Sequence, residues 1–161
     1  MLIEFDQMPA TARAWIYQAD KELKASEISL MEENLRAFIS QWTAHSAALR
    51  ASFKFFHNRF LVLAVDESLH GASGCSIDAS VRFIQKLGTE LGCDFFDRRV
   101  VFVQGDQLIA EPVKNLKQLI AEGIIEKNTS VFNNSVSTLE AFQKEWQKPA
   151  LESWLKKYFT H

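Results

Sequence analysis

The chain has 161 residues, of which 47% are hydrophobic and 24% charged, so it can bury a sizeable core and is predicted to form a single domain over residues 1–161. Its net charge is −2 and it carries no long basic run, which argues against a protein that binds nucleic acid through phosphate contacts. No apolar stretch approaches the roughly 18 residues that span a bilayer, so we expect no membrane association.

The first half of the chain is predicted to alternate between strands and helices. Runs of β-branched and aromatic residues predict strands, and apolar residues three or four apart predict helices. The expected elements are a strand at 13–18, a helix at 27–43 that starts near Ser26 or Ser29, a hairpin of 50–56 and 59–65 that turns at His57-Asn58, and a helix at 77–91. We expect Ser76 to be the N-cap of the second helix and Gly92 to end it in the left-handed conformation.

The second half contains shorter elements. They are a hairpin of 99–104 and 107–111 around Gly105-Asp106, a short helix opened by Pro112, an extended piece at 131–134, a helix from Ser137 to about 147, and an amphipathic helix that starts at Pro149. The order β-α-β-β-α-β is the split βαβ, or ferredoxin-like, pattern. We therefore predict an α+β fold with a ferredoxin-like core, one extra strand and C-terminal helices.

The two cysteines, Cys75 and Cys93, lie near opposite ends of the helix predicted at 77–91. At about 1.5 Å per residue that helix separates them by roughly 20–25 Å, far beyond the ~7 Å between Cα atoms that a disulfide allows. We expect two free thiols and a reducing, cytoplasmic location.

The predicted topology gathers polar residues at one end of the sheet. In a split βαβ, the connection after the first helix and the connection after the third strand lie at the same end. The end of the first helix, with Trp42 and His45, is therefore expected beside residues 66–78. This rim combines the carboxylates of Asp66 and Glu67, the imidazoles of His45 and His70, the Cys75 thiol and several hydroxyls, and we predict that it is the working surface.

One interpretation of the rim is a thiol enzyme. Cys75 is expected just before a helix, where the helix dipole favours the thiolate. His45 or His70 could act as its base, and Asp66 or Glu67 could orient that base. The alternative is that Cys75 fills space in a tight loop.

Another interpretation is a binding site. Backbone amides of the Gly71–Gly74 turn could bind a small anion, although the phosphate-loop motif is absent. The candidate ligand-binding residues are Trp42, Glu67, Ser68, Ser73, Gly74, Ser76, Asp78 and Asn133. Each also has a structural alternative: the serines as helix caps, Trp42 as core, and Asn133 as part of a turn. We expect no metal site and no cofactor, because the adjacent Asp66 and Glu67 would point in different directions on a strand and no zinc motif is present.

Short segments over most of the chain carry a resemblance: Gln41-Trp42-Thr43-Ala44-His45, Asn58-Arg59-Phe60, Asp66-Glu67-Ser68, Ala72-Ser73-Gly74-Cys75-Ser76-Ile77-Asp78, Asp94-Phe95-Phe96 and Val131-Phe132-Asn133-Asn134. In them the chain is similar to a family of small bacterial proteins of unassigned function, some of which are labelled "ABC transporter ATPase". Because the phosphate loop is missing here, the resemblance implies a shared domain and no known reaction.

Three functions follow as expectations. The first is a domain that binds a small molecule or a protein partner at the rim, without turnover. The second is an enzyme with Cys75 as nucleophile and His45 as base. The third is a structural domain that forms a homodimer, since ferredoxin-like sheets often expose an apolar face.

Overall fold

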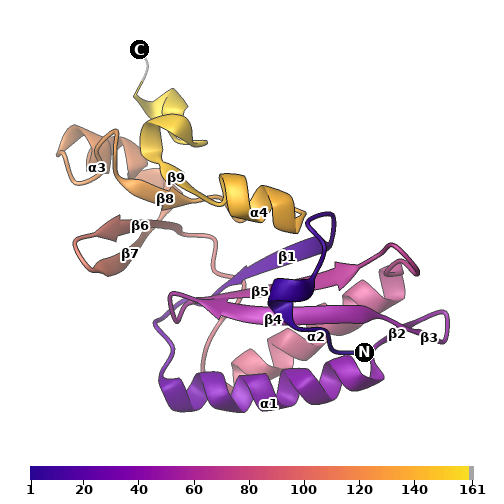
Figure 1. Ribbon diagram of the computed structural model, residues 1–161. Coiled ribbons are helices and arrows are strands. Elements are labelled where there is room, and N and C mark those ends of the chain that lie inside the picture. Colours follow the sequence, from indigo (N-terminus) through magenta and orange to yellow (C-terminus); the bar gives the residue numbers. More distant parts are fainter. Residues whose placement is uncertain (160–161) are drawn as a thin grey trace. The chain divides into compact units, whose positions relative to one another are not determined.

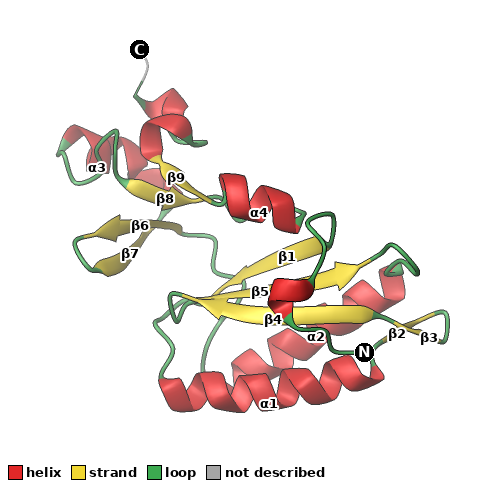
Figure 2. Cartoon of the chain, viewed as in Figure 1, coloured by secondary structure: helices red, strands yellow, loops and turns green. Residues whose placement is uncertain are grey.

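The computed structural model describes residues 1–159 and contains two compact units (Figure 1). The first unit comprises Met1–Asp97 and Ser137–Glu140, and the second comprises the rest of the chain. Helices and strands are mixed in the chain (Figure 2), which confirms the α+β class. The expectation of a single domain stays a prediction. No helix within the described part of the chain is both long enough and apolar enough to cross a membrane.

The first unit is built on a three-stranded antiparallel sheet. Its strands are β1 (Arg13–Gln18), β4 (Arg50–Phe56) and β5 (Phe60–Asp66), in the order β1-β5-β4. Every residue of β5 is buried, as expected for a continuous apolar run in a central strand. The three predicted strands and the central place of the third are therefore confirmed.

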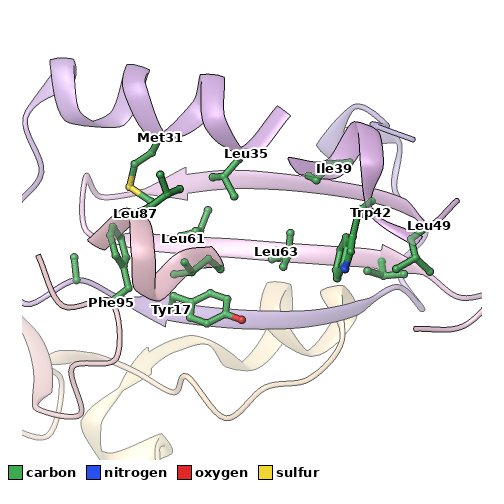
Figure 3. Packing of buried hydrophobic residues seen from close by; sticks show 14 of the residues in the cluster. Tyr17, Met31, Leu35, Ile39, Trp42, Leu49, Leu61, Leu63, Leu87 and Phe95 are labelled. Carbon is green, nitrogen blue, oxygen red and sulfur yellow. The ribbon is translucent and has the colours of Figure 1, made fainter. Parts of the chain in front are cut away.

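Two helices, α1 (Ala25–Gln41) and α2 (Gly74–Leu91), pack their apolar stripes against the sheet. Figure 3 shows side chains of α1 directed at the middle of β5. The fully buried residues of this core include Met31, Leu35, Ile39, Leu61 and Leu63.

The helix starts differ from the predicted ones. α1 begins after Lys24, whose N–H donates to the Glu27 carboxylate at 3.0 Å, so neither Ser26 nor Ser29 is the N-cap. α2 begins after Ser73, so Ser76 lies in its first turn and the predicted Ser76 cap is wrong. The predicted left-handed end at Gly92 is confirmed, with φ of 66°.

Two tight turns shape the ends of the sheet. His57 and Asn58 have φ of 54° and 52°, which confirms the predicted hairpin turn between β4 and β5. A second, very short hairpin was not predicted: β2 (Thr43–Ala44) pairs with β3 (Ala47–Ala48) between α1 and β4. Its turn residues, His45 and Ser46, also have positive φ.

The outer edges of this sheet are only partly covered. At β1, the Ala14 N–H donates to the Ser137 carbonyl and the Asp97 N–H donates to the Gln18 carbonyl. At β4, the N-terminal residues pair with Ala51 alone, through its N–H to the Met1 carbonyl and its carbonyl to the Ile3 N–H. The chain then turns away into a 3₁₀ turn, η1 (Phe5–Gln7).

The fourth strand of a ferredoxin-like sheet would lie beside β1. Here the segment after α2 makes one bridge to β1, between Phe96 and Gln18, and then leaves. The strand predicted for that place, observed as β6 (Val100–Gln104), belongs to the sheet of the second unit. The first sheet therefore realises three of the four strands of the predicted pattern.

The second unit has a four-stranded antiparallel sheet in the order β7-β6-β8-β9, with β7 (Gln107–Glu111), β8 (Ser130–Phe132) and β9 (Gln147–Pro149). The predicted β6–β7 hairpin is confirmed, with Gly105 at φ of 62°. Its core combines Phe102 and Val131 with residues of α3 (Leu116–Ala121), which follows a 3₁₀ turn, η2 (Val113–Asn115).

The predicted C-terminal helices are shorter than expected. α4 spans Leu139–Glu145. The amphipathic helix predicted from Pro149 is not formed: Pro149 ends β9, and two 3₁₀ turns follow, η3 (Ala150–Glu152) and η4 (Lys156–Tyr158). Ala150 and Leu155 still enter the core of the second unit, so the apolar spacing reflects burial without a continuous helix.

Candidate functional site

The predicted rim does assemble in the first unit, and Trp42 and His70 hold it together. The Trp42 indole N–H donates to the Ser76 carbonyl at 2.9 Å, which fastens the end of α1 to the first turn of α2. His70 Nε2 lies 2.6 Å from the Ala44 carbonyl oxygen, and it must carry the proton because a carbonyl only accepts. The expected proximity of the two connections is confirmed. Trp42 itself is 3% exposed and belongs to the core, as its structural alternative predicted.

The acidic residues of the rim are bound within their own loop. The Asp66 carboxylate accepts the Ser68 N–H at 3.0 Å and lies 3.5 Å from Arg50 Nε. Hydrogen bonds from Ser68, with a smaller contribution from Arg50, lower the pKa of Asp66. Glu67 accepts the Ala72 N–H at 2.8 Å. These contacts brace the turn between β5 and α2.

The serines of the rim cap α2. The Ser73 hydroxyl accepts the Ser76 N–H at 3.1 Å, and the Ser76 hydroxyl accepts the Ser73 N–H at 2.8 Å. This reciprocal arrangement satisfies donors that a helix start leaves unpaired. Ser76 is 4% exposed, so its hydroxyl serves the cap and not a ligand in solvent.

The proposed catalytic groups are not coupled to one another. Cys75 lies in the first turn of α2, with Gly74 before it, and its thiol is exposed. His45 is exposed at the β2–β3 turn. Within residues 1–159, no hydrogen bond joins the Cys75 thiol to His45 or to His70. Asp66 is occupied by Ser68 and Arg50, so it does not orient a base.

Two further predicted residues lie apart from this network. Asp78 is an exposed residue of α2. Asn133 belongs to the second unit, where its side-chain oxygen accepts both the N–H and the hydroxyl of Ser135. That geometry is typical of a turn stabilised by asparagine, in agreement with its structural alternative. Across the described residues, no three His, Cys, Asp or Glu side chains gather closely enough to hold a metal ion.

Sequence reasoning missed a second feature of the first unit, which we call the β4 groove. It is a cavity of about 470 Å³. Its lining residues come from the N-terminal segment, from α1 and from β4. The lining residues are Leu2, Ile3, Glu4, Phe5, Asp6, Ile28, Glu32, Arg36, Ser52, Phe53, Lys54, Phe55 and Asn58.

The floor of the β4 groove carries free backbone groups. Ala51 directs its N–H and carbonyl outward to Met1 and Ile3, and this direction alternates along a strand. The backbone groups of Phe53 and Phe55 therefore also point outward. The opposite edge of the sheet follows the same alternation, because the backbone N–H of Ala14 and the backbone carbonyl of Gln18 point outward from β1. Since the N-terminal segment leaves β4 after Ile3, it does not pair with Phe53 or Phe55.

Charged residues border the groove on both sides. On one side, Lys54 Nζ lies 3.8 Å from the Asp6 carboxylate and 5.6 Å from the centre of the Phe56 ring. On the α1 side, Arg36 pairs with Glu32 at 3.4 Å. Between them lie Ile28 and the Phe53 and Phe55 rings, which pack against the core of the unit.

A signal for this groove was present in the predicted topology. The second strand of a split βαβ is an edge strand, and the Phe-Lys-Phe alternation at 53–55 puts apolar and charged side chains on opposite faces. What could not be read from the chain was where the N-terminal segment leaves the edge. Comparison of the chain with family models, with curated proteins and with solved structures gave no match. The resemblance to a family of small bacterial proteins stays a prediction.

Proposed function

We propose that the protein is a binding domain that holds a partner polypeptide in the β4 groove and catalyses no reaction. The observation that carries this proposal is the groove itself: a cavity of about 470 Å³ that is charged at both borders, holds Ile28 and two phenylalanine rings between them, and is floored by a strand edge with free backbone groups. Its volume lies within the roughly 300–1,000 Å³ that ligand-binding pockets occupy.

The predicted rim supports this proposal less well as a site of chemistry. Its carboxylates and hydroxyls are engaged by backbone groups of the same loop, and its tryptophan is buried. In this proposal the rim is a scaffold that joins α1 to α2. The proposal keeps the binding function that was expected from the sequence. It places the binding site in the β4 groove and not at the rim.

The proposal can be tested by selecting peptides from a random displayed library on the full chain. Affinities are then measured for wild type, Ile28→Gln and Leu30→Gln. Ile28 lines the groove, whereas Leu30 is an exposed leucine of the same helix outside it. We expect Ile28→Gln to weaken binding about tenfold, because an apolar contact is lost, and Leu30→Gln to leave it within about twofold. A selection without binders, or equal effects of both variants, contradicts the proposal.

The thiol-enzyme alternative retains one supporting observation, the exposed Cys75 thiol in the first turn of α2. The test is the rate of iodoacetamide alkylation against pH, with Cys93 as the internal control. Burial, together with its contact to Asp20, raises the pKa of Cys93 to about 12, so we expect this thiol to stay unmodified in the folded protein at neutral pH. A Cys75 that reacts with an apparent pKa well below about 8.5, and less readily in His45→Ala, would favour the enzyme. An ordinary titration of Cys75 would end that reading.

A further inference from the structure

We propose that the occupant of the β4 groove is an extended peptide that adds to β4 as an antiparallel strand and carries an acidic residue between two apolar ones. This inference rests on the binding function proposed above. It goes further by giving the ligand a backbone conformation, a direction and a side-chain pattern.

The backbone of β4 supports strand addition. Phe53 and Phe55 each present an outward N–H and an outward carbonyl to the groove, next to the point where Ile3 leaves the same edge. In antiparallel pairing, one peptide residue exchanges two hydrogen bonds with Phe53 and the residue two positions earlier exchanges two with Phe55. The β1–β5 and β4–β5 pairs are antiparallel, the more stable arrangement, whereas the single bridge of Leu2 to Ala51 at this edge is parallel. Addition of a strand to an exposed edge is an established mode of peptide recognition.

The alternation of side chains then sets the pattern of the ligand. Residues directly opposite each other in a sheet share a face. The two peptide residues opposite Phe53 and Phe55 would lie on the α1 side, beside Ile28 and the two rings, where apolar side chains fit. The residue between them would lie on the other face, opposite Lys54.

Lys54 selects the charge of that middle residue. Its side chain is 48% exposed, and its ion-pair partner Asp6 is 87% exposed at 3.8 Å, so the existing pair is weak. The position opposite Lys54 is one where the two strands do not exchange hydrogen bonds and their side chains approach most closely. A carboxylate there gains a favourable cross-strand contact with the ammonium group.

The same geometry disfavours a second copy of the chain as the occupant. Two β4 edges joined about a twofold axis would use Phe53 and Phe55 of each copy and would place the two Lys54 side chains directly opposite each other. Like charges at such a position are destabilising. A peptide with an acidic middle residue avoids this repulsion.

The first experiment is hydrogen exchange of the full chain with a capped peptide that contains Val-Glu-Val. The Phe53 and Phe55 amides are unpaired and should exchange more slowly when the peptide is present. The Lys54 amide already pairs with β5, so its exchange should not change. Unchanged exchange at Phe53 and Phe55 under saturating peptide contradicts strand addition.

The second experiment is an N-methyl scan of the same peptide, measured by titration. Methylation of either valine amide removes a donor to β4, and we expect about tenfold weaker binding. Methylation of the glutamate amide, which points away from β4, should leave affinity within about twofold. Equal tolerance at all three amides, or the reverse pattern, overturns the antiparallel strand.

Charge reversal provides the matched test of Lys54. Lys54→Glu should weaken the Val-Glu-Val peptide several-fold, and a Val-Lys-Val peptide should recover that loss on the variant. The two proposals fail in different ways. If library peptides bind in an Ile28-dependent manner but ignore methylation and charge reversal, only the strand inference fails. If no peptide depends on Ile28, the proposed function fails as well.

Discussion

Asp66 is the last residue of the central strand, and its ionised side chain holds the following loop by accepting a hydrogen bond. It is 8% exposed, yet the Ser68 N–H and the Arg50 guanidinium face it, so the charged form is satisfied inside the fold. A buried carboxylate that accepts a hydrogen bond and faces a cation is typical of a structural acid. We therefore expect the ionised Asp66 side chain to stabilise the rim.

The lowered pKa of Asp66 predicts a specific pH dependence. A carboxyl whose pKa is lower in the folded than in the unfolded state stabilises the fold above its unfolded pKa, and this stabilisation is lost as pH falls through the folded pKa. We expect the free energy of unfolding of wild type to decrease as the pH falls below 3.8, the ordinary pKa of an aspartate side chain. Asp66→Asn should make the free energy of unfolding less dependent on pH in this range.

The measurement is urea unfolding of both proteins from neutral pH down to the acid limit of folding. At neutral pH, Asp66→Asn should be less stable by about 1 kcal/mol, because hydrogen bonds to a charged acceptor are weakened. Parallel acid profiles for the two proteins would show that another carboxyl governs this range.

Single residues explain why the candidate site was only partly predicted. The residue types at Ser73, Ser76 and Glu67 suit both ligand binding and helix or loop capping, and sequence does not reveal which partner each finds. Trp42 likewise suited both the core and the loop from its place in the sequence. In the structure its ring lies in the core and its indole N–H donates to the Ser76 carbonyl. Polar residues near a helix start bind their own backbone first, because those donors are close and otherwise unpaired.

At the level of elements, α2 shows how a close approach constrains a helix. Gly88 is buried, and its carbonyl accepts the Cys93 N–H at 2.8 Å as the chain folds back beneath the helix end. A Cβ on Gly88 would clash with the Cys93 carbonyl oxygen, a backbone atom. Only glycine permits this return of the chain.

Gly88→Ala should therefore destabilise the protein, although alanine is normally the better helix residue. We expect a loss of about 1–3 kcal/mol, because backbone must move to admit the methyl group. Gly74→Ala is the matched control in the same helix, since a Cβ there meets nothing within 4 Å. Thermal melts of both variants test this, and a stabilised Gly88→Ala would refute the packing argument.

Elements with a strong periodic pattern were predicted within a few residues, and short ones were not. The apolar residues of α1 and α2 recur at helical spacing, and those of β5 form a continuous buried run, so these elements are clear in the sequence. The two-residue strands at 43–44 and 47–48 have no period to detect, and left-handed turns at histidine and serine are uncommon. The apolar residues after Pro149 suggested a helix because they recur at helical spacing. They recur because they are buried in the core of the second unit, and only short 3₁₀ turns form there.

At the level of the whole molecule, the predicted fold failed at one strand. The order of the first three strands and both helices was correct, because the split βαβ requires only local pairing and one crossover. The place of β6 depends on whether residues 99–104 pair with β1 or with β7 and β8. β7 is the hairpin neighbour of β6, but the choice between β1 and β8 as its other partner is made between segments far apart in the chain, and composition and periodicity do not identify it.

The free edge of β4 leads to a prediction about self-association. Lys54 lies at the centre of the exposed edge, and lysine there discourages pairing between copies. We expect wild type to sediment as a single chain and Lys54→Val to self-associate as concentration rises. Lys54→Arg keeps the charge and should behave as wild type. Dimerisation of wild type through this edge would instead support the homodimer function expected from sequence.

The central strand also has a kinetic consequence. β4 and β5 are joined by a tight turn, so their pairing closes a small loop, whereas Gln18 pairs with Phe60 and Arg13 with Val65 across all of α1. During synthesis, β1 leaves the ribosome before α1, β4 and β5 exist, and it must wait for its partner. Local contacts close at a smaller entropic cost than distant ones. We therefore expect the β4–β5 hairpin and α1 to form the folding nucleus. We expect β1 to pair with β5 in a later step that completes the sheet.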